Sequence, residues 1–312
     1  MKKFKRKALV IAAMLGAVVS FNPSVAPINP ISPIVPSNVA LGATSINVSV
    51  EQRNIVNDID WSHGANSVIV AEGRGRSNGK GISMARLAAI TDAQRHLLGI
   101  IKGVQIDADT LMLDLMIEND TVRSKVSGLL RGAVIIEEHT LGDEEYSVKM
   151  CIPLYGPLGS LASVVVPEIM DGSAPDPFPN VDPNTFNNAE MQSIRDAHYT
   201  GVVINADGMD MSPTFSPVIY DTSGRAIYGV DNLDYDTVIE KGMVDYANDM
   251  NGARLDNRAG SNPLVIDAVD VRGGQNSTNK VNAVVSVEDA NKILVANEAT
   301  DMLEDTSVVF VK

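Results

Sequence analysis

The chain has 312 residues, enough for about two domains of ordinary size. Apolar residues make up 45% and aromatic residues only 4%, which excludes general disorder and predicts a core of aliphatic side chains. The formal net charge of −14 excludes a general electrostatic attraction to nucleic acid or to anionic lipid.

Residues 1–26 have the pattern of a secretory signal peptide. Five basic residues precede an apolar run from Ala8 to Phe21, which is shorter than the roughly 20 residues of a membrane-spanning helix. Small residues favour cleavage after Ala26, and a second cleavage site is possible near Ala43. An uncleaved N-terminal anchor is the alternative.

Export predicts a periplasmic, cell-surface or extracellular protein. Removal of the five bases leaves 20 bases against 39 acids, a net charge of −19 for the mature chain. Cys151, the single cysteine, lies far from the predicted cleavage sites, so we expect no lipid anchor. It cannot form an intrachain disulfide, and its apolar strand pattern predicts a buried, inert thiol.

A Pro-rich extended leader over residues 27–45 precedes a first domain over residues 46–156. The predicted order is β-α-β-α-β-β, a small α+β domain with its helices on one face of the sheet. We expect strands at 67–73, within 104–113, at 133–141 and at 146–155, and helices at 83–102 and 120–131. The inward positions predicted for the first helix are Ile82, Ala85, Ala89, Ala93, Leu97 and Ile100. Its alanines predict a helix axis that lies close to the sheet.

The Gly-rich stretch AEGRGRSNGKGIS, Ala71 to Ser83, raises the possibility of a phosphate site. Neither the P-loop spacing nor the dinucleotide-binding spacing is present: Gly75 and Gly79 are too close, Lys80 precedes Gly81, and Asn78 replaces a required glycine. Arg74 and Arg76 leave weak anion binding open. A flexible strand-to-helix turn is the favoured interpretation.

Other candidate catalytic or metal-binding residues are scattered. Ser83 in GISMA is near the G-x-S-x-G pattern of hydrolases, but an N-cap role explains it better. The four histidines, none at metal-ligand spacing, are His63, His96, His139 and His198. The carboxylate clusters are Glu137–Glu138, Asp143–Glu145, Asp207 with Asp210, and Asp231, Asp234 and Asp236 with Glu240. The last resembles a calcium loop only weakly, so we predict no catalytic or cofactor-binding residue and leave the metal open.

Residues 157–198 are predicted to hold one short helix and a Pro-rich linker over 171–188. A second, mixed α/β domain follows over residues 199–312. We expect strands at 199–206, 262–271, 282–287 and 306–312, a hairpin at 216–230 that turns at Asp221–Gly224, and a helix capped by Ser286 and Asp289.

The first domain resembles a known family. The strand end with Ala71, Gly73 and Gly75, the helix core with Ala85, Arg86, Ala89, Asp92 and Ala93, and the pair Gly132–Ala133 are similar to the Lpp-twenty family of envelope lipoproteins and to the N-terminal domain of flagellar assembly protein T. The resemblance covers residues 68–156. It implies a small α+β domain and a non-enzymatic envelope or assembly role, although the lipid-bearing cysteine is missing.

We therefore expect an exported, non-catalytic envelope protein that needs no cofactor and binds envelope proteins or itself. The resemblance implies a flagellum- or surface-associated role. The alternative is an extracytoplasmic module that binds a divalent cation or a cell-wall fragment, for which the acidic clusters are the motivation. A hydrolase is a lesser alternative. No nucleic-acid partner and no transmembrane segment in the mature chain are expected.

Overall fold

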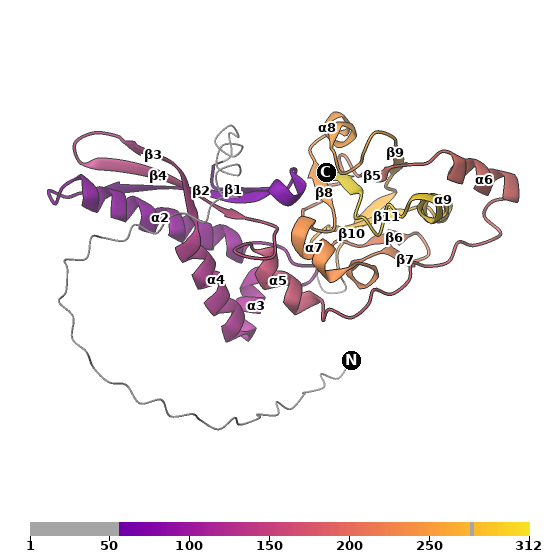
Figure 1. The fold of residues 1–312 in the computed structure, drawn as a ribbon, viewed down its shortest axis with the longest axis horizontal. Coiled ribbons are helices and arrows are strands. Elements are labelled where there is room, and N and C mark those ends of the chain that lie inside the picture. The colour runs from indigo at the N-terminus through magenta and orange to yellow at the C-terminus, as the bar shows by residue number, and fades with distance from the viewer. Residues whose placement is uncertain (1–55, 275–277) are drawn as a thin grey trace, which may run out of the picture. The chain divides into compact units, whose positions relative to one another are not determined.

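The computed structural model describes residues 56–274 and 278–312, which form an α+β protein of two domains (Figure 1). The predicted signal peptide, the leader and the first residues of the first domain lie outside the described residues. Within the described ranges, no helix combines the length and the apolar character needed to cross a membrane.

The first domain is built on one antiparallel sheet, with strands in the order β1-β2-β4-β3. Its strands are β1 (Asp58–Asp60), β2 (Val68–Arg76), β3 (Val134–Thr140) and β4 (Glu145–Pro153). Its helices are α2 (Ile82–Lys102), α3 (Met112–Glu118), α4 (Asp120–Gly132) and α5 (Ala162–Ile169), with a short 3₁₀ turn η1 (Gly64–Asn66) after β1. The predicted hairpin of β3 and β4 is confirmed.

Helix α2 packs closely on β2 because both surfaces carry very small side chains. Ala85, Ala89 and Ala93 of the helix are fully buried. A Cβ atom added to Gly73 would lie 2.1 Å from the backbone nitrogen of Ala93, and one added to Gly75 would lie 2.1 Å from the carbonyl oxygen of Ala85. Any other residue at either glycine would push the helix off the sheet. The prediction of a closely seated helix is thus confirmed.

Several local predictions in this domain are wrong. Residues 104–113 form no strand; they make a single bridge from Gln105 to Leu111 and enter α3. The observed order from β1 to β4 is therefore β-β-α-α-α-β-β, and α5 follows β4. Ile82 is exposed. Ile101 rather than Ile100 completes the buried face of α2, because the buried positions from Ala85 to Leu97 recur every four residues and Ile101 continues that row.

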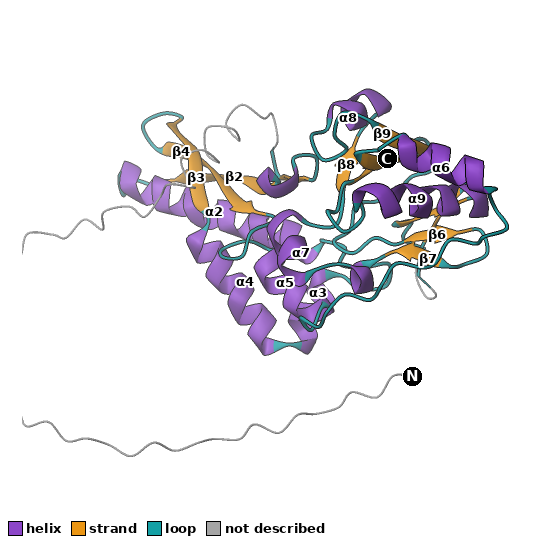
Figure 2. Ribbon diagram, turned by 45° about the vertical axis from the view of Figure 1, so that its right-hand side comes forward, coloured by secondary structure: helices purple, strands orange, loops and turns teal. Residues whose placement is uncertain are grey.

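The second domain contains two four-stranded sheets (Figure 2). One is entirely parallel, with strands in the order β8-β12-β5-β9. The other has the order β10-β11-β6-β7, with a parallel pair at its centre and antiparallel edge strands. The predicted mixed α/β character is confirmed, as is the cap of α9, where the Ser286 hydroxyl accepts a hydrogen bond from the Asp289 amide.

The element bounds show what the sequence patterns missed in this domain. The strands are β5 (Gly201–Asn205), β6 (Ile219–Asp221), β7 (Ala226–Tyr228), β8 (Asp245–Ala247), β9 (Pro263–Asp267), β10 (Asp270–Arg272), β11 (Asn282–Val285) and β12 (Val308–Val311). The helices are α6 (Asn188–Asp196), α7 (Tyr235–Lys241), α8 (Met250–Leu255) and α9 (Val287–Thr300), with a 3₁₀ turn η2 (Val230–Asn232). The strand predicted over 262–271 is two strands, β9 and β10, in different sheets, so that prediction is wrong.

The two domains share one continuous hydrophobic cluster, which runs from Ile69 in β2 to Phe310 in β12. Aromatic rings join it where the domains meet. Trp61 of the first domain lies edge-on to Phe215 at 5.6 Å and to Tyr246 at 5.9 Å, measured between ring centroids. The chain has few aromatic residues, so this concentration makes the junction a packed joint rather than a hinge.

Candidate functional site

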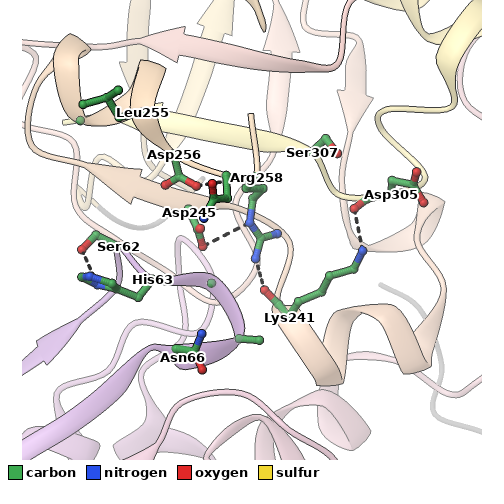
Figure 3. Close-up of a pocket in the computed structure, with 14 residues that line it drawn as sticks. Ser62, His63, Asn66, Lys241, Asp245, Leu255, Asp256, Arg258, Asp305 and Ser307 are labelled. Carbon is green, nitrogen blue, oxygen red and sulfur yellow. Dashed lines mark hydrogen bonds and ion pairs between the residues drawn. The ribbon is translucent and has the colours of Figure 1, made fainter. Parts of the chain in front are cut away.

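A cleft of about 610 Å³ lies at the joint between the two domains (Figure 3). The first domain contributes the segment from Ser62 through η1, which leaves the short strand β1. The second domain contributes the end of α7, the start of β8, the segment after α8, and residues that precede β12. Its lining is rich in charged and amide side chains, which makes it the strongest candidate for a site.

Arg258 forms the floor of this cleft. Its Nη1 donates to the carbonyl oxygens of Gly242 at 3.2 Å and Thr306 at 3.0 Å, and its Nη2 donates to the carbonyl oxygen of Lys241. Its Nε lies 3.2 Å from Oδ1 of Asp245. The guanidinium therefore ties the end of α7 to the segment before β12 and leaves few donors for a ligand.

Asp245 is the partner of Arg258, and its side chain is only 3% exposed. Its Oδ1 accepts no hydrogen bond from the described residues, so the attraction to Arg258 is chiefly Coulombic. Burial raises the pKa of Asp245 to about 6, and Arg258 only partly opposes this rise. Gly64 of the first domain covers the carboxylate, with a φ of +51°. A Cβ atom there would lie 3.2 Å from Oδ2 of Asp245.

His63 stands on the first-domain side of the cleft and is held by Asp60. The Nδ1 atom of His63 lies 2.8 Å from Oδ2 of Asp60, and the Ser62 hydroxyl donates to Oδ1 of Asp60 at 2.8 Å. Burial alone would raise the pKa of Asp60, but hydrogen bonds from His63 and Ser62 outweigh it and lower that pKa. The serine hydroxyl thus donates to the carboxylate, which is not the order of a catalytic triad.

Most charged side chains of the cleft therefore bind other parts of the protein, and few reactive groups remain available to a ligand. Lys241 donates from Nζ to the carbonyl oxygen of Asp305 at 3.1 Å, so this cation is also engaged. Nε2 of His63 is the ring atom that remains for a ligand, but a single imidazole does not make a metal site. Across residues 56–274 and 278–312, no three His, Cys, Asp or Glu side chains gather closely enough to hold a metal ion.

The Gly-rich stretch of the sequence is divided between a strand and a tight turn. Gly73 and Gly75 belong to β2, which ends at Arg76 and so extends beyond the strand predicted at 67–73. In the turn itself, the Gly79 amide donates to Oε1 of Glu144 at 3.0 Å, and the Ser77 amide donates to the Glu144 carbonyl oxygen at 2.8 Å. The protein's own glutamate thus occupies the place where an anion would bind.

Ser83 does not cap α2, contrary to prediction. The helix begins at Ile82, and the N-cap is Gly81, whose φ of +88° suits glycine. Ser83 is exposed in the first turn.

The histidines lie on separate elements. Nδ1 of His96 in α2 is 2.7 Å from the carbonyl oxygen of Glu72, and Nε2 of His139 in β3 is 2.5 Å from Oε1 of Glu137. His198 follows α6 with a positive φ of 46°. His63 is the candidate histidine that reaches the cleft at the joint.

The stretch compared with a calcium loop is not a loop. Its second half forms helix α7, and Oδ1 of Asp234 caps that helix by accepting a hydrogen bond from the Thr237 amide at 2.9 Å. In the first domain, Glu138 pairs with Arg86 and Glu145 with Arg76. The carboxylates therefore serve caps and ion pairs at these positions.

Sequence reasoning missed the central pair of the cleft, Asp245 and Arg258. One signal was present: an aspartate interrupts the apolar stretch MVDYA, and a buried charge requires a partner. The sequence does not identify that partner, because Arg258 lies beyond helix α8 and reaches back through the fold.

Comparison with known proteins gives one finding for the second domain. Residues 201–312 match the family of Treponema pallidum Tp0624, second domain. The matched region runs from β5 through β12 and thus contains both sheets of this domain, together with Asp245 and Arg258. A search of curated proteins gives no match to the chain.

Proposed function

We propose that this is an exported, non-catalytic protein of the cell envelope that acts in binding or assembly. The observation that carries the proposal is the joint. The amides of Phe215 and Ser216 in the second domain donate to the carbonyl oxygens of Gln105 and Ile106 in the first, at 3.1 Å and 2.8 Å. The Trp61 ring of the first domain also packs edge-on against Phe215, so the two domains act as one stiff unit. A stiff unit can hold surfaces at a fixed spacing, which suits assembly better than a reaction that requires closure of a cleft.

The sequence adds the remaining support. The signal-like pattern of residues 1–26 favours export, and the strongly acidic composition favours solubility in an extracytoplasmic compartment. The resemblance of residues 68–156 to the Lpp-twenty family and to flagellar assembly protein T favours an envelope, surface or flagellar setting, with envelope proteins or a second copy as partners.

Export and assembly are tested together in cells. We expect mass spectrometry to find a mature N-terminus near Ala26 or Ala43, and fractionation to place the protein outside the cytoplasm. Chemical cross-linking should trap it with envelope proteins or with itself. An intact Met1 in the cytoplasmic fraction contradicts export, and a monomer that cross-links to nothing contradicts assembly.

The competing functions have their own measurements. A cation-binding module predicts a rise in melting temperature with millimolar calcium, since a ligand stabilises the folded state that binds it. A hydrolase predicts that Ser83 or a histidine lies in a cleft with carboxylates. Ser83 lies exposed at the start of α2 and does not line the cleft. His63 does lie in the cleft with carboxylates, and Asp60 holds its Nδ1, but the neighbouring Ser62 hydroxyl donates to Asp60, so this arrangement lacks a placed nucleophile.

A further inference from the structure

The predicted linker is not a free tether. Residues 171–187, here called the strap, lie along the second domain without regular strand or helix structure. The amide of Asp176 donates to the carbonyl oxygen of Asp231 at 2.8 Å. The amide of Asp182 donates to Oδ1 of Asn291 at 2.9 Å. The strap is therefore docked at both of its halves.

Side chains of the second domain recognise the strap mainly through its backbone. Nδ2 of Asn232 donates to the carbonyl oxygens of Asp176 and Pro177, each at 3.3 Å. Nη1 of Arg225 donates to the carbonyl oxygen of Asn180 at 3.1 Å. Carbonyl oxygens are present in any extended chain, so these contacts fix the path of a peptide with little regard to its sequence.

One aromatic contact adds selectivity. The Phe178 ring stacks on Tyr228, with centroids 6.3 Å apart and an angle of 11° between the rings. Prolines at 177 and 179 flank this phenylalanine. Proline restricts the unbound segment to extended conformations, so less conformational entropy is lost when it docks.

The docking surface itself is preformed. Arg225 is held by Oδ2 of Asp221 at 2.9 Å and by Oδ1 of Asn291 at 3.2 Å, and Nδ2 of Asn291 donates to the carbonyl oxygen of Val287 at 3.0 Å. These contacts belong to the second domain alone and do not depend on the strap. Donors held in this way keep their direction when the strap leaves, which is what a binding groove requires.

The strap, by contrast, buries little of its side-chain surface. Most of its residues are exposed, Phe178 is only half-buried, and a hollow of about 540 Å³ lies between residues 175–181 and helix α9. Segments with few buried apolar contacts open at low free energy, and the covalent tether supplies a high effective concentration that compensates.

We propose that the surface under the strap is a peptide-binding groove, and that an extended segment of a partner protein, with a phenylalanine flanked by prolines, takes the place of the strap. The groove is defined by Arg225, Tyr228, Asn232 and Asn291. This inference deepens the proposed assembly role by naming the surface that would carry it.

The test uses the chain without its predicted signal, in which residues 175–186 are replaced by a Gly/Ser segment of the same length. The probe is a fluorescent peptide of residues 174–187. We expect saturable binding, and at least about tenfold weaker binding for the peptide with Phe178→Ala, because aromatic anchors dominate such interfaces. The matched protein control is Asn232→Ala in the same background, which should also weaken binding.

Absence of saturable binding overturns the proposal if the emission of Trp61 and the circular dichroism spectrum match those of the unmodified chain. Hydrogen exchange on the unmodified chain gives an independent test if the replacement does not fold. The amides of Asp176 and Asp182 should exchange at least about tenfold faster than those of β5. Equal rates would mean that the strap leaves only on global unfolding, and would overturn the proposal.

The peptide measurement is separate from the test of export and assembly. If the peptide fails to bind while the protein still cross-links to envelope proteins, only the assignment of this surface is wrong. If the peptide binds while the protein remains cytoplasmic, the groove stands and the envelope role is wrong.

Discussion

Asp221 and Asp245 lie in the same domain, each faces an arginine, and their side chains are 1% and 3% exposed. Their acidities nevertheless shift in opposite directions. Burial favours the protonated form of both. At Asp221, hydrogen bonds from Ser223 and Arg225 outweigh that effect and lower the pKa, whereas burial raises the pKa of Asp245 to about 6.

One difference is burial, which raises the pKa of Asp245 more because Asp245 lies deeper in the protein than Asp221. The other is the number of hydrogen-bond donors and where they come from. Oδ1 of Asp221 accepts from the amide and the hydroxyl of Ser223 and from the amide of Arg225, all within one hairpin turn. Oδ1 of Asp245 accepts no hydrogen bond from the described residues. A buried carboxylate is thus stabilised by the donors around it. At Asp245, Arg258 and the Gly64 amide lower the pKa but do not outweigh burial.

The largest effect should come from Arg258→Ala. The substitution leaves Asp245 buried without its counter-ion and leaves the carbonyl oxygens at the joint without donors, so we expect a loss of about 3–5 kcal/mol of unfolding free energy. Arg225→Ala is the matched control, and its loss should be about 1–2 kcal/mol because this side chain is 30% exposed. Urea unfolding followed by circular dichroism measures both, and equal losses would contradict the comparison.

The pH dependence should separate the two aspartates next. The pKa of Asp245 is raised to about 6 on folding, so its contribution to stability is full below pH 4 and is lost as the pH rises through 6. The loss is at most about 3 kcal/mol. Unfolding of Asp245→Asn should show a flatter profile between pH 4 and 7.

Histidines also change charge in this range, so His63→Gln is the necessary control for that measurement. Asp256 and Arg258 from the second domain face Asp245 as well, and neither is altered by this control. A profile that flattens in His63→Gln but not in Asp245→Asn would assign the effect to the histidine and contradict the interpretation of Asp245.

Asp221→Asn should have a smaller effect with the opposite sign. The lowered pKa of Asp221 means that its contribution is present above its unfolded pKa and is lost as the pH falls. We expect a cost of about 1–2 kcal/mol at pH 7, which shrinks in acid, because the amide keeps one acceptor but loses the charge that pairs with Arg225. Thermal unfolding at pH 7 and pH 3 checks this expectation, and a cost that grows in acid would be evidence against it.

The smallest expected difference is between Gly64→Ala, above the Asp245 carboxylate, and Gly79→Ala. Gly64 and Gly79 both have positive φ, +51° and +77°, so alanine at either position costs about 1 kcal/mol in backbone strain. A Cβ atom at Gly79 meets nothing within 4 Å, whereas one at Gly64 lies 3.2 Å from Oδ2 of Asp245. Gly64→Ala should therefore cost more than Gly79→Ala, by about 1 kcal/mol. Equal losses of unfolding free energy would show that the backbone at Gly64 moves away from Asp245 without a measurable cost.

Features made by residues that are close in the sequence were predicted well, and features made by residues that are distant in the sequence were not. The turn at Asp221–Gly224, with its left-handed glycine, and the Ser286 cap were predicted correctly because each involves neighbours in sequence. The strand predicted within 104–113 was wrong, because its apolar residues are buried by a turn and by helix α3 rather than by a sheet. Ser83 was misplaced by two residues, since the positive φ of Gly81 starts the helix earlier.

The candidate site was predictable only in part. His63 was visible as one of four histidines, but its orientation by Asp60 and its position opposite Arg258 depend on the joint between the domains. The segment over residues 171–188 was predicted to be a linker because prolines and short polar residues form no core. It docks because Asn232 and Arg225, distant in sequence, supply donors for its carbonyl oxygens.

By itself, the sequence determined the α+β class, most of the strands and helices, and the close seating of α2 on the sheet, since hydrophobic periodicity, turn residues and small side chains act over short distances along the chain. Only the tertiary structure decided the pairing of Asp245 with Arg258, the aromatic joint at Trp61 and the docking of the strap. The physical reason is that the free energy of a buried charge, or of an unpaired carbonyl group, depends on which groups the fold brings beside it.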